Sequence, residues 1–460
     1  MNYSEAREYL KNVNKLGSIL GLNTIKELLK RLGNPQNELK VVHIAGTNGK
    51  GSIMTFVQNI LMESGYKVGR YCSPAVFNER EIIRINDEYI SEEQSADLLT
   101  RIKEKCDSMY SEGLPHPTSF EIETAEALMF FKEQNCDIAL IECGIGGETD
   151  ATNVFEKVLC SVIATISLDH TQFLGSTIEE ITKVKSGIIK ENCPVVMSKQ
   201  IVEAESVIKK VCKQNNSKLI IPTEQDSENV EIDGLTTKVT YKASNNKEYI
   251  LNLQALGTYQ IKNAKTAVEV ALVLDKALTE KTNICDESDK NNGTGMKNNI
   301  NNSGNTIEKN IKKGIEKTVW PGRMEVISKE PLIIIDGAHN PGAVLELRKT
   351  LDLYFTNKRI TFIMGVLSDK DFSKEAEIIA DRAERIITIT PNNSRGLDGH
   401  KLAETLVKYN HNVQVADSLK QAAEESIYTI KENRADMILA FGSLSYLGEL
   451  KQVVRLVCNH

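Results

Sequence analysis

The sequence predicts an α/β protein with two domains: a larger N-terminal domain with a mostly parallel sheet, and a smaller, doubly wound domain at the C-terminal end. Short apolar runs alternate with longer helical patterns through most of the chain, which is typical of successive βαβ units. Several of these runs end in glycine-rich turns, where open parallel sheets bind ligands. A length of 460 residues also favours two or three domains over one.

The N-terminal part alternates strands and helices from the first apolar run onwards. We expect strands at residues 39–45, 137–142 and 159–166, and helices at about 52–63, 92–109, 120–134 and 178–190. Residues 230–253 change to short β-type runs with few helix signals. We interpret this segment as an antiparallel addition to the first domain.

The alternation restarts with a shorter period near the C-terminal third of the chain. Strands are expected at residues 332–335, 360–364, 386–390, 413–416 and 437–441, with helical patterns between them. Five such units in about 130 residues predict the doubly wound domain. We place the boundary near Trp320, giving domains 1–319 and 320–460.

One segment fits neither domain. Residues from about 286 to 310 are rich in asparagine and glycine and nearly devoid of core-forming side chains. Such a stretch cannot offset its ordering entropy by burial, so we expect a mobile surface insertion.

Composition excludes several classes of protein. Lys and Arg total 56 and Asp and Glu total 63, a formal charge of −7, which argues against a broadly basic nucleic-acid binder. No apolar run is long enough to span a membrane, and the N-terminal residues do not resemble a signal peptide. Nine cysteines without a C-x-x-C pair favour neither a disulfide framework nor a zinc module. A cytoplasmic protein with no nucleic-acid or membrane partner is expected.

The strongest local signal is the sequence G-T-N-G-K-G-S at residues 46–52, between a predicted strand and a predicted helix. Strand, glycine turn and helix N-terminus together present backbone N–H groups to phosphate oxygens, and Lys50 adds a positive charge. The motif differs from the standard Walker A pattern because Gly51 separates Lys50 from Ser52. A glycine-rich turn with a solvated lysine is the alternative. We favour nucleotide binding, and hence a P-loop-type first domain.

Other polar clusters follow predicted strands. Glu142 precedes a glycine-rich turn, where its carboxylate would suit Mg²⁺, although an exposed glutamate in a turn is the alternative. His170 is a metal ligand, a phosphate contact or an ordinary loop histidine. Lys183 and Lys185 would by default form the polar face of a helix. Residues 336–341, D-G-A-H-N-P, fall at the expected domain interface, a preferred place for ligands.

Taken together and in order, these motifs resemble the folylpolyglutamate synthase/dihydrofolate synthase family within the Mur ligase superfamily. The resemblance extends from about residue 43 to residue 445 and leaves out the asparagine-rich segment. The motifs are G-T-N-G-K-G-S (46–52), S-P (73–74), F-N-E-R (77–80), G-I-G-G-x-x-D-A-T-N (144–153), S-L-D-H-T (167–171), W-P-G-R-M-E (320–325) and D-G-A-H-N-P (336–341).

The resemblance implies an ATP-dependent ligase that adds L-glutamate to a folate-type acceptor through an acyl phosphate. Its substrates would be ATP, L-glutamate and a folate, with dihydropteroate as a further acceptor, and a monomer is the family expectation. A free carboxylate is a poor electrophile, and phosphoryl transfer needs positioning and charge neutralisation more than a covalent catalyst.

The resemblance also implies roles for individual residues. Lys50, His170 and Lys185 would be catalytic. Two Mg²⁺ ions would be held by Ser73, Glu142, His170 and a carbamylated Lys185. ATP would contact Gly49, Lys50, Gly51, Ser52, Asn263, Arg323, Asp336 and His339. The pteroate part of the acceptor would face Thr118, Ser119, Phe120, Glu121, Thr149, Asp150 and Ala151.

The sequence departs from the family pattern at three places: Ala75 stands where histidine is usual, Glu148 where arginine is usual, and Val184 changes the motif around Lys185. The first two affect expectations about substrate details rather than about the ligase reaction. The alternatives are a Mur-type amino-acid ligase acting on a cell-wall precursor and a non-catalytic ATP-binding switch. The phosphate loop begins at residue 46, which leaves too little chain for a separate UDP-sugar domain. The set of metal-ligating residues would be unnecessary in a simple switch.

Overall fold

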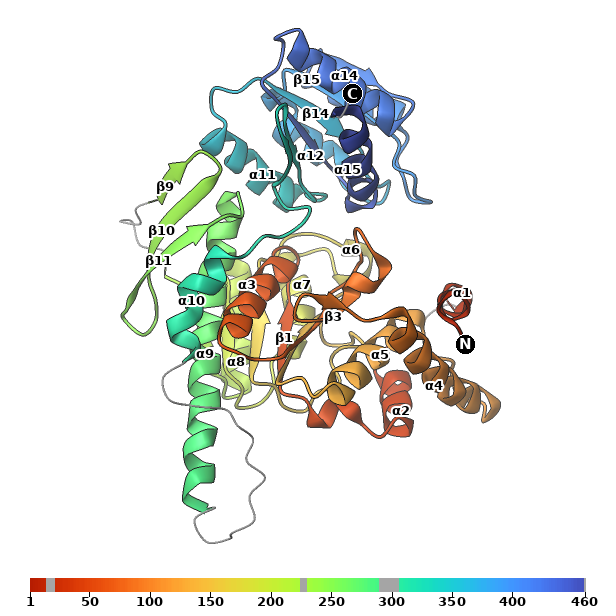
Figure 1. Cartoon of the computed structure of the whole chain (residues 1–460), viewed down its shortest axis with the longest axis vertical. Coiled ribbons are helices and arrows are strands. Elements are labelled where there is room, and N and C mark those ends of the chain that lie inside the picture. The colour runs from red at the N-terminus through yellow and green to blue at the C-terminus, as the bar shows by residue number, and fades with distance from the viewer. Residues whose placement is uncertain (14–20, 224–229, 289–305, 459–460) are drawn as a thin grey trace.

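The structure is a computed structural model that describes residues 1–13, 21–223, 230–288 and 306–458, with the side chains of residues 280–288 left out. The two larger of the three sheets lie one above the other in Figure 1, and we call each of these two with its helices a lobe. Most of the predicted insertion at 286–310 lies outside the described residues. The described ends of that segment are helical, since one helix ends at Ser288 and the next begins at Ile307.

The first lobe contains an eight-stranded sheet in the order β4-β3-β2-β5-β1-β6-β7-β8. β3 pairs antiparallel with both β2 and β4 and the other pairings of this sheet are parallel, so the mostly parallel sheet is confirmed. The central β1 pairs with β5 and β6, and all of its residues are buried. The strands are β1 (Val41–Ala45), β2 (Val68–Tyr71), β3 (Ile83–Ile85), β4 (Glu88–Tyr89), β5 (Ile138–Glu142), β6 (Cys160–Ile163), β7 (Val195–Met197) and β8 (Leu219–Ile220).

Helices cover both faces of this sheet. On one face α3, α9 and α10 share a core with inward side chains of β1, β5 and β6. On the other face α1, α2, α4 and α5 pack on a second core, while α7 and α8 cover the edge near β7. The helices are α1 (Tyr3–Val13), α2 (Asn23–Arg31), α3 (Lys50–Glu63), α4 (Glu92–Ser111), α5 (Ser119–Glu133), α6 (Thr171–Leu174), α7 (Ile178–Lys185), α8 (Val202–Gln214), α9 (Thr258–Ser288) and α10 (Ile307–Glu316).

The segment predicted as an antiparallel addition forms a separate three-stranded sheet. Its strands β9 (Val230–Asp233), β10 (Thr236–Lys242) and β11 (Glu248–Leu253) pair antiparallel, as expected. Alternate residues of β10 and β11, including Val239 and Leu251, join the core beneath α9 and α10. This sheet therefore adds to the core of the first lobe.

The second lobe is a six-stranded sheet in the order β12-β13-β17-β14-β15-β16, parallel except for β12. Helices α11, α12 and α13 pack on one face and α14 and α15 on the other, so the doubly wound prediction is confirmed. The elements are β12 (Glu325–Lys329), β13 (Leu332–Ile335), α11 (Pro341–Tyr354), β14 (Ile360–Met364), α12 (Phe372–Ile379), β15 (Arg385–Thr388), α13 (Gly399–Leu406), β16 (Val413–Val415), α14 (Leu419–Lys431), β17 (Met437–Phe441) and α15 (Leu444–Cys458).

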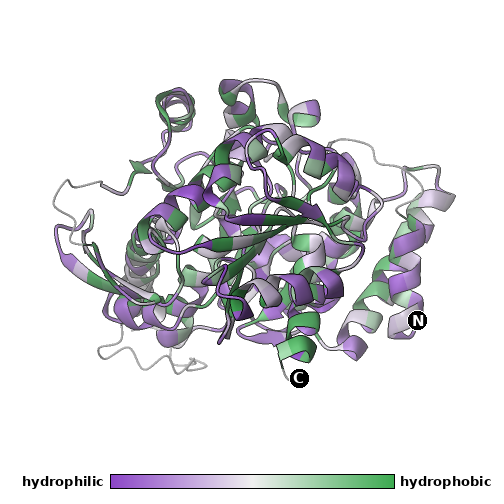
Figure 2. Cartoon of the chain, turned by 90° about the horizontal axis from the view of Figure 1, so that it is seen from above, coloured by the Kyte–Doolittle hydropathy of each residue, from purple (hydrophilic) through white to green (hydrophobic). Residues whose placement is uncertain are grey.

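Figure 2 shows green, hydrophobic strands inside a shell of helices with largely purple surfaces. Among the described residues, no helix combines the length and apolar character needed to cross a membrane. The cysteines whose side chains are described are free thiols.

Candidate active site

The predicted phosphate loop connects β1 to α3. Gly49 adopts a φ of 91°, which glycine reaches without strain, and Lys50 is the first residue of the helix. A Cβ on Gly49 would lie 2.6 Å from Oδ1 of Asn263, so α9 approaches the loop closely at this point. The backbone N–H groups of Thr47 and Asn48 donate to the carbonyl of Thr165, at 2.8 and 3.0 Å, and fix the loop beside the end of β6.

The first turn of α3 contains Gly51 and the buried Ser52. A Cβ on Gly51 would lie 2.8 Å from the ring of Trp320, so this glycine also lies in close contact with a neighbour. The N–H groups in the first turn of a helix lack partners within the helix and create a partial positive charge there. The loop and helix therefore form a site suited to an anion such as a phosphate.

Lys50 and Glu142 form an ion pair beside the phosphate loop. The ammonium group of Lys50 lies 3.5 Å from Oε1 of Glu142, at the end of β5, and donates to the carbonyl of Thr47 at 3.3 Å. The thiol of Cys72 donates to Oε2 of Glu142 at 2.6 Å. Burial and the neighbouring Glu142 raise the pKa of the Cys72 thiol well above its ordinary value, so the thiol stays protonated. Ser73 follows Cys72, which brings two predicted metal ligands to adjacent strand ends.

Lys185 and His170 lie on the other side of the loop. Lys185 ends α7, is 4% exposed, and donates to the carbonyl of Gly46 at 3.0 Å. Burial, reinforced by the charge of Lys50, lowers its pKa to about 8. Burial also lowers the pKa of His170; Asp169 opposes this shift, whereas nearby lysines including Lys185 and Lys50 reinforce it. The predicted catalytic residues Lys50, His170 and Lys185 therefore share one electrostatic environment.

The first predicted acceptor segment begins α5. Thr118 caps the helix: its hydroxyl accepts from the N–H of Glu121 at 3.2 Å, while the carboxylate of Glu121 accepts from the N–H of Thr118 at 2.7 Å. Ser119 is the first residue of the helix. A Cβ on Gly144 would lie 2.6 Å from the ring of Phe120. Phe120 therefore packs against the glycine cluster that follows Glu142.

The second predicted acceptor segment is the turn at residues 149–151. The carboxylate of Asp150 accepts from the N–H groups of Ile145 and Thr152 at 2.9 and 3.0 Å, and burial raises its pKa. Ala151 is buried and Thr149 is exposed. Asp150 thus holds the glycine cluster in shape, and Thr149 is the member of this segment that is open to a ligand.

The predicted nucleotide residues of the second lobe cluster around Asp336. Its carboxylate accepts from the Tyr259 hydroxyl at 2.6 Å and from the N–H of Met324 at 2.8 Å. Burial raises the pKa of Asp336, against the opposing effect of Arg323. The guanidinium of Arg323 crosses Gly337, where a Cβ would collide with it.

His339 lies in the same cluster. Its Nδ1 donates to the carbonyl of Gly337 at 2.7 Å, and burial together with the charge of Lys370 lowers its pKa to about 4. At neutral pH the imidazole is therefore uncharged, so it can bind a nucleotide as a neutral group and not as a cation.

Three side chains join the two lobes beside the phosphate loop. Asn48 and Asn340 exchange two hydrogen bonds, each of 3.1 Å. Asn340 also donates to Oδ2 of Asp169 at 3.1 Å and accepts from the N–H of Ala343, which caps α11. This contact fixes the start of α11 against the loop.

An ion pair continues the connection. Lys370 lies 2.7 Å from Oδ1 of Asp169, with the side chains 8% and 10% exposed. Burial favours the neutral form of Asp169, but the charge of Lys370 outweighs this effect and the pKa is lowered. Lys370 was not among the residues predicted from the sequence. The signal that could have identified it is S-D-K-D at residues 368–371, a polar cluster shortly after the predicted strand at 360–364.

The predicted metal ligands are of the chemical types that Mg²⁺ binds. Among the described residues, no group of three or more His, Cys, Asp and Glu side chains is placed to hold a metal ion. The predicted set has one carboxylate, Glu142, at the phosphate loop, with a serine hydroxyl and an imidazole nearby. Mg²⁺ takes one or two carboxylates and completes its shell with water and phosphate oxygens, so such a sparse set suits an ion that arrives with a nucleotide.

Two of the departures from the family pattern lie at the surface, and the third, Val184, is half-buried with its side chain beside Gly146 of the glycine cluster. Ala75 and Glu148 are exposed. The N–H of Glu148 donates to the carbonyl of Val184 at 2.9 Å, which ties the glycine cluster to α7. The geometry gives no reason for the acidic side chain at this position.

Comparison with known proteins agrees with this geometry. Residues 44–271 match the Mur ligase middle domain, and residues 322–444 match the Mur ligase glutamate ligase domain. The chain is 30% identical to dihydrofolate synthase/folylpolyglutamate synthase of Bacillus subtilis over 461 residues, which cover 98% of each protein.

Two solved structures are similar over almost their whole length. The crystal structure of folylpolyglutamate synthase from Thermotoga maritima is 32% identical, with a TM-score of 0.77 and coverage of 98% of this chain and 96% of that one. An FPGS–AMPPCP–folate complex is 28% identical, with a TM-score of 0.80 and coverage of 99% and 100%. The chain therefore belongs to the dihydrofolate synthase/folylpolyglutamate synthase family of the Mur ligases.

Proposed function

We propose that the protein is an ATP-dependent ligase that adds L-glutamate to a folate-type acceptor. The observation that carries the proposal is the position of Lys50, at the start of a helix, 3.5 Å from Glu142 and beside residues that reach over from the second lobe. The relatives support the substrate class, since they are a dihydrofolate synthase/folylpolyglutamate synthase and a complex with AMPPCP and folate.

The first step is transfer of the γ-phosphoryl group of ATP to a carboxylate of the acceptor, which gives an acyl phosphate and ADP. This transfer depends on in-line positioning and on neutralising the phosphate charge. The N–H groups of the first turn of α3 and the ammonium of Lys50 supply fixed positive charge at the loop. We assign the phosphates to Gly49, Lys50, Gly51 and Ser52.

The adenosine end of ATP would lie between the lobes. Asn263 touches the loop from α9, and Arg323, Asp336 and His339 cluster at the near edge of the second lobe. We assign these four residues to the nucleoside. Because they come from both lobes, a bound nucleotide would hold the lobes together.

We assign Mg²⁺, as two ions, to Ser73, Glu142, His170 and a carbamylated Lys185. When bound, magnesium supplies positive charge that neutralises the phosphate oxygens. A carbamate forms on a neutral amine, and the lowered pKa of Lys185, about 8, leaves part of that amine neutral near physiological pH. Burial of Lys185 in contact with Gly46 also places it beside the loop.

The second step is attack of the glutamate amine on the acyl phosphate, which forms the amide and releases phosphate. The intermediate must be kept from water, and the contacts of Asn340 and Lys370 with Asn48 and Asp169 would limit the access of water beside the loop. We assign the pteroate part of the acceptor to residues 118–121 and 149–151, where Phe120 and Thr149 are the residues best placed to touch it.

We also propose a monomeric, cytoplasmic enzyme with domains 1–319 and 320–460 and with small-molecule substrates only. Free cysteines in the described part of the chain support a reducing compartment. The change from the first sheet to the second between α10 and β12 supports the position of the boundary.

The decisive experiment offers dihydropteroate and tetrahydrofolate separately, with ATP, Mg²⁺ and L-glutamate, and identifies products by mass. We expect one glutamate added per phosphate released, with tetrahydrofolate as an acceptor and dihydropteroate as a second one. Release of phosphate only with a UDP-linked cell-wall precursor would support the Mur-type alternative. Tight ATP binding without any turnover would support the switch.

A further inference from the structure

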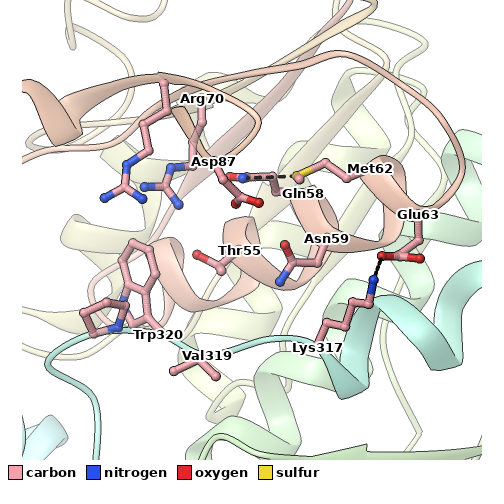
Figure 3. Close-up of a pocket in the computed structure, with 12 residues that line it drawn as sticks. Thr55, Gln58, Asn59, Met62, Glu63, Arg70, Asp87, Lys317, Val319 and Trp320 are labelled. Atoms are coloured by element: carbon pink, nitrogen blue, oxygen red, sulfur yellow. Dashed lines mark hydrogen bonds and ion pairs between the residues drawn. The ribbon is translucent and has the colours of Figure 1, made fainter. Parts of the chain in front are cut away.

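A cavity of about 470 Å³ lies between α3, the β2–β3 hairpin and the segment that links the two lobes (Figure 3). Thr55 and Asn59 line it from α3, Arg70 and Arg84 from the hairpin, and Lys317 and Trp320 from the linking segment. Its volume is within the range of about 300–1,000 Å³ that is usual for small-molecule sites. None of these residues has a role in the proposed ligase reaction.

Arg70 is the most unusual residue of this cavity. It is 2% exposed, and its Nε has no hydrogen-bond partner among the described residues. Its guanidinium lies over the ring of Trp320, 5.1 Å from the ring centre. Burial, together with the charge of Arg84, lowers the pKa of Arg70, although the carboxylates of Glu142 and Glu81 partly oppose this shift. A buried charge without a partner destabilises a protein unless something else neutralises it.

A second arginine increases the positive charge. In the antiparallel pairing of β2 and β3, Arg70 lies directly opposite Arg84, and like charges in this position repel each other. Arg84 forms an ion pair with Glu81, at 3.7 Å, and its guanidinium lies over the ring of Tyr89, 4.4 Å from the ring centre. Figure 3 shows the Arg70 guanidinium above the Trp320 ring, facing the open space of the cavity.

The acidic residues that line the cavity do not compensate Arg70. Glu63 is paired with Lys317 and Lys313 on the far side of the cavity. Asp87 is exposed, and no ion pair between Asp87 and Arg70 is present among the described residues. Arg70 therefore faces the cavity without an ion pair among the described residues, and Arg84, although paired with Glu81, adds a second positive charge to the lining.

We infer that this cavity binds an oxyanion, the carboxylate or phosphate group of a small molecule, between Arg70 and Arg84. The planar guanidinium matches both groups because it can donate two parallel hydrogen bonds to a pair of oxygens. The site is separate from the phosphate loop, but Trp320 lies between them because it also packs on Gly51. An anion here would connect the hairpin to the segment that leads into the second lobe.

The protein contains its own reporter for this test, because Trp320 is the only tryptophan of the chain. Inorganic phosphate and glutarate are titrated separately into the full-length protein while tryptophan fluorescence is measured. We expect a saturable change with at least one probe, and the probe that acts identifies the source of the oxyanion. The Lys50→Ala variant should respond like the wild type, which separates this site from the phosphate loop.

Two variants test the residues themselves. Arg70→Leu and Arg84→Leu should each weaken binding of the active probe by about tenfold or more, the loss expected for a hydrogen bond between charged groups. Arg70→Leu should fold, because an apolar residue replaces an unpaired buried charge. Arg434→Leu, at an exposed arginine of the second lobe, is the matched control and should bind normally.

The inference is wrong if neither probe changes the fluorescence, or if both arginine variants bind like the wild type. It is also wrong if the response disappears in Lys50→Ala, since the probe would then be bound at the phosphate loop. The ligase assay gives an independent result. An Arg70-dependent response in a protein without ligase activity would keep this site and reject the proposed function.

Discussion

Lys50 is placed by two contacts, one with the carbonyl of Thr47 and one with the carboxylate of Glu142. Its side chain is 14% exposed, so the ammonium is directed into the protein and not into solvent. A lysine held in this way at the start of a helix is ready to meet a phosphate without reorganising. The turnover of the proposed ligase should therefore depend on Lys50.

We expect Lys50→Ala to lower ligase turnover by about 100-fold or more, because a fixed charge is lost where negative charge must be neutralised. The fold should be retained, since no described hydrogen bond of the helix depends on this side chain. Phosphate release and the melting temperature measure the two effects. Lys374→Ala, at an exposed lysine of α12, is the control and should keep full activity. Normal turnover in Lys50→Ala would contradict the assignment of the loop.

Lys185 gives a second test. We expect Lys185→Ala to lose activity and to recover part of it when acetate or formate is added, because a small carboxylate could occupy the place of a carbamate oxygen. The measurement is turnover against carboxylate concentration. Addition of chloride at the same ionic strength is the control. Failure of both carboxylates would leave the carbamate without support.

The sequence predicted which residues would lie near the phosphate loop where they end or follow a strand, and their roles stay predictions. Lys50, Glu142 and His170 each come after an apolar run, and parallel strands bring such positions to one edge. The pairing of Asn48 with Asn340 could not be predicted, because it joins residues 292 positions apart through the packing of the lobes. The roles of Thr118, Glu121 and Asp150 also needed the structure, since their side chains hold a helix start and a turn.

Strands that are uniformly apolar were predicted with the correct limits. The strands β13, β14 and β17 begin and end where expected, because each is a run of mostly buried side chains. The strand β2 was not predicted, because V-G-R-Y contains a glycine and a buried arginine and so is not an apolar run. The edge strand β12 was missed because its residues are only partly buried and of mixed polarity. The helix expected at 178–190 ends at Lys185, and a short 3₁₀ turn follows.

The packing of α4 on α5 includes a buried carboxyl group. The hydroxyl of Ser95 donates to Oε1 of Glu126 at 2.6 Å, and burial raises the pKa of Glu126 to about 8. In the unfolded chain this pKa is near 4.5. Between these values the unfolded state releases a proton that the folded state keeps. Stability is therefore fully present below about pH 4.5 and is lost as the pH rises through about 8.

We expect Glu126→Gln to remove this pH dependence, because the amide is neutral at every pH and still accepts from Ser95. The melting temperature of the variant minus that of the wild type should increase between pH 5 and pH 8. Over this range the wild type loses, to order of magnitude, several kilocalories per mole of stability that the variant keeps. Glu104→Gln, on the exposed face of α4, is the matched control and should follow the wild type. Parallel profiles for Glu126→Gln and wild type would contradict the assignment.

The two lobes are joined at the phosphate loop by side chains of both. The ion pair of Asp169 and Lys370 is shielded from water, and Asn340 connects it to Asn48. A shielded pair couples its partners more strongly than an exposed one, because water and salt screen it less. The relative position of the lobes should therefore depend on this contact.

A double-mutant cycle measures that dependence. We expect Asp169→Asn and Lys370→Met to show a coupling of about 1–3 kcal/mol in urea unfolding, and each single variant to lower ligase turnover. The pair Lys374–Glu377 is the control: both side chains are about half exposed, and its coupling should remain below about 1 kcal/mol. Equal coupling in the two pairs would show that the interlobe contact does not hold the lobes together.

The polypeptide passes from the first sheet to the second between α10 and β12, and each described strand pairing lies wholly on one side of that crossing. A gene divided there would encode two pieces, one with Lys50 and Glu142 and the other with Asn340 and Lys370. Neither piece could carry out catalysis alone. If both were produced in one cell, ligase activity would return only when they assemble, so an activity or growth assay would measure their assembly.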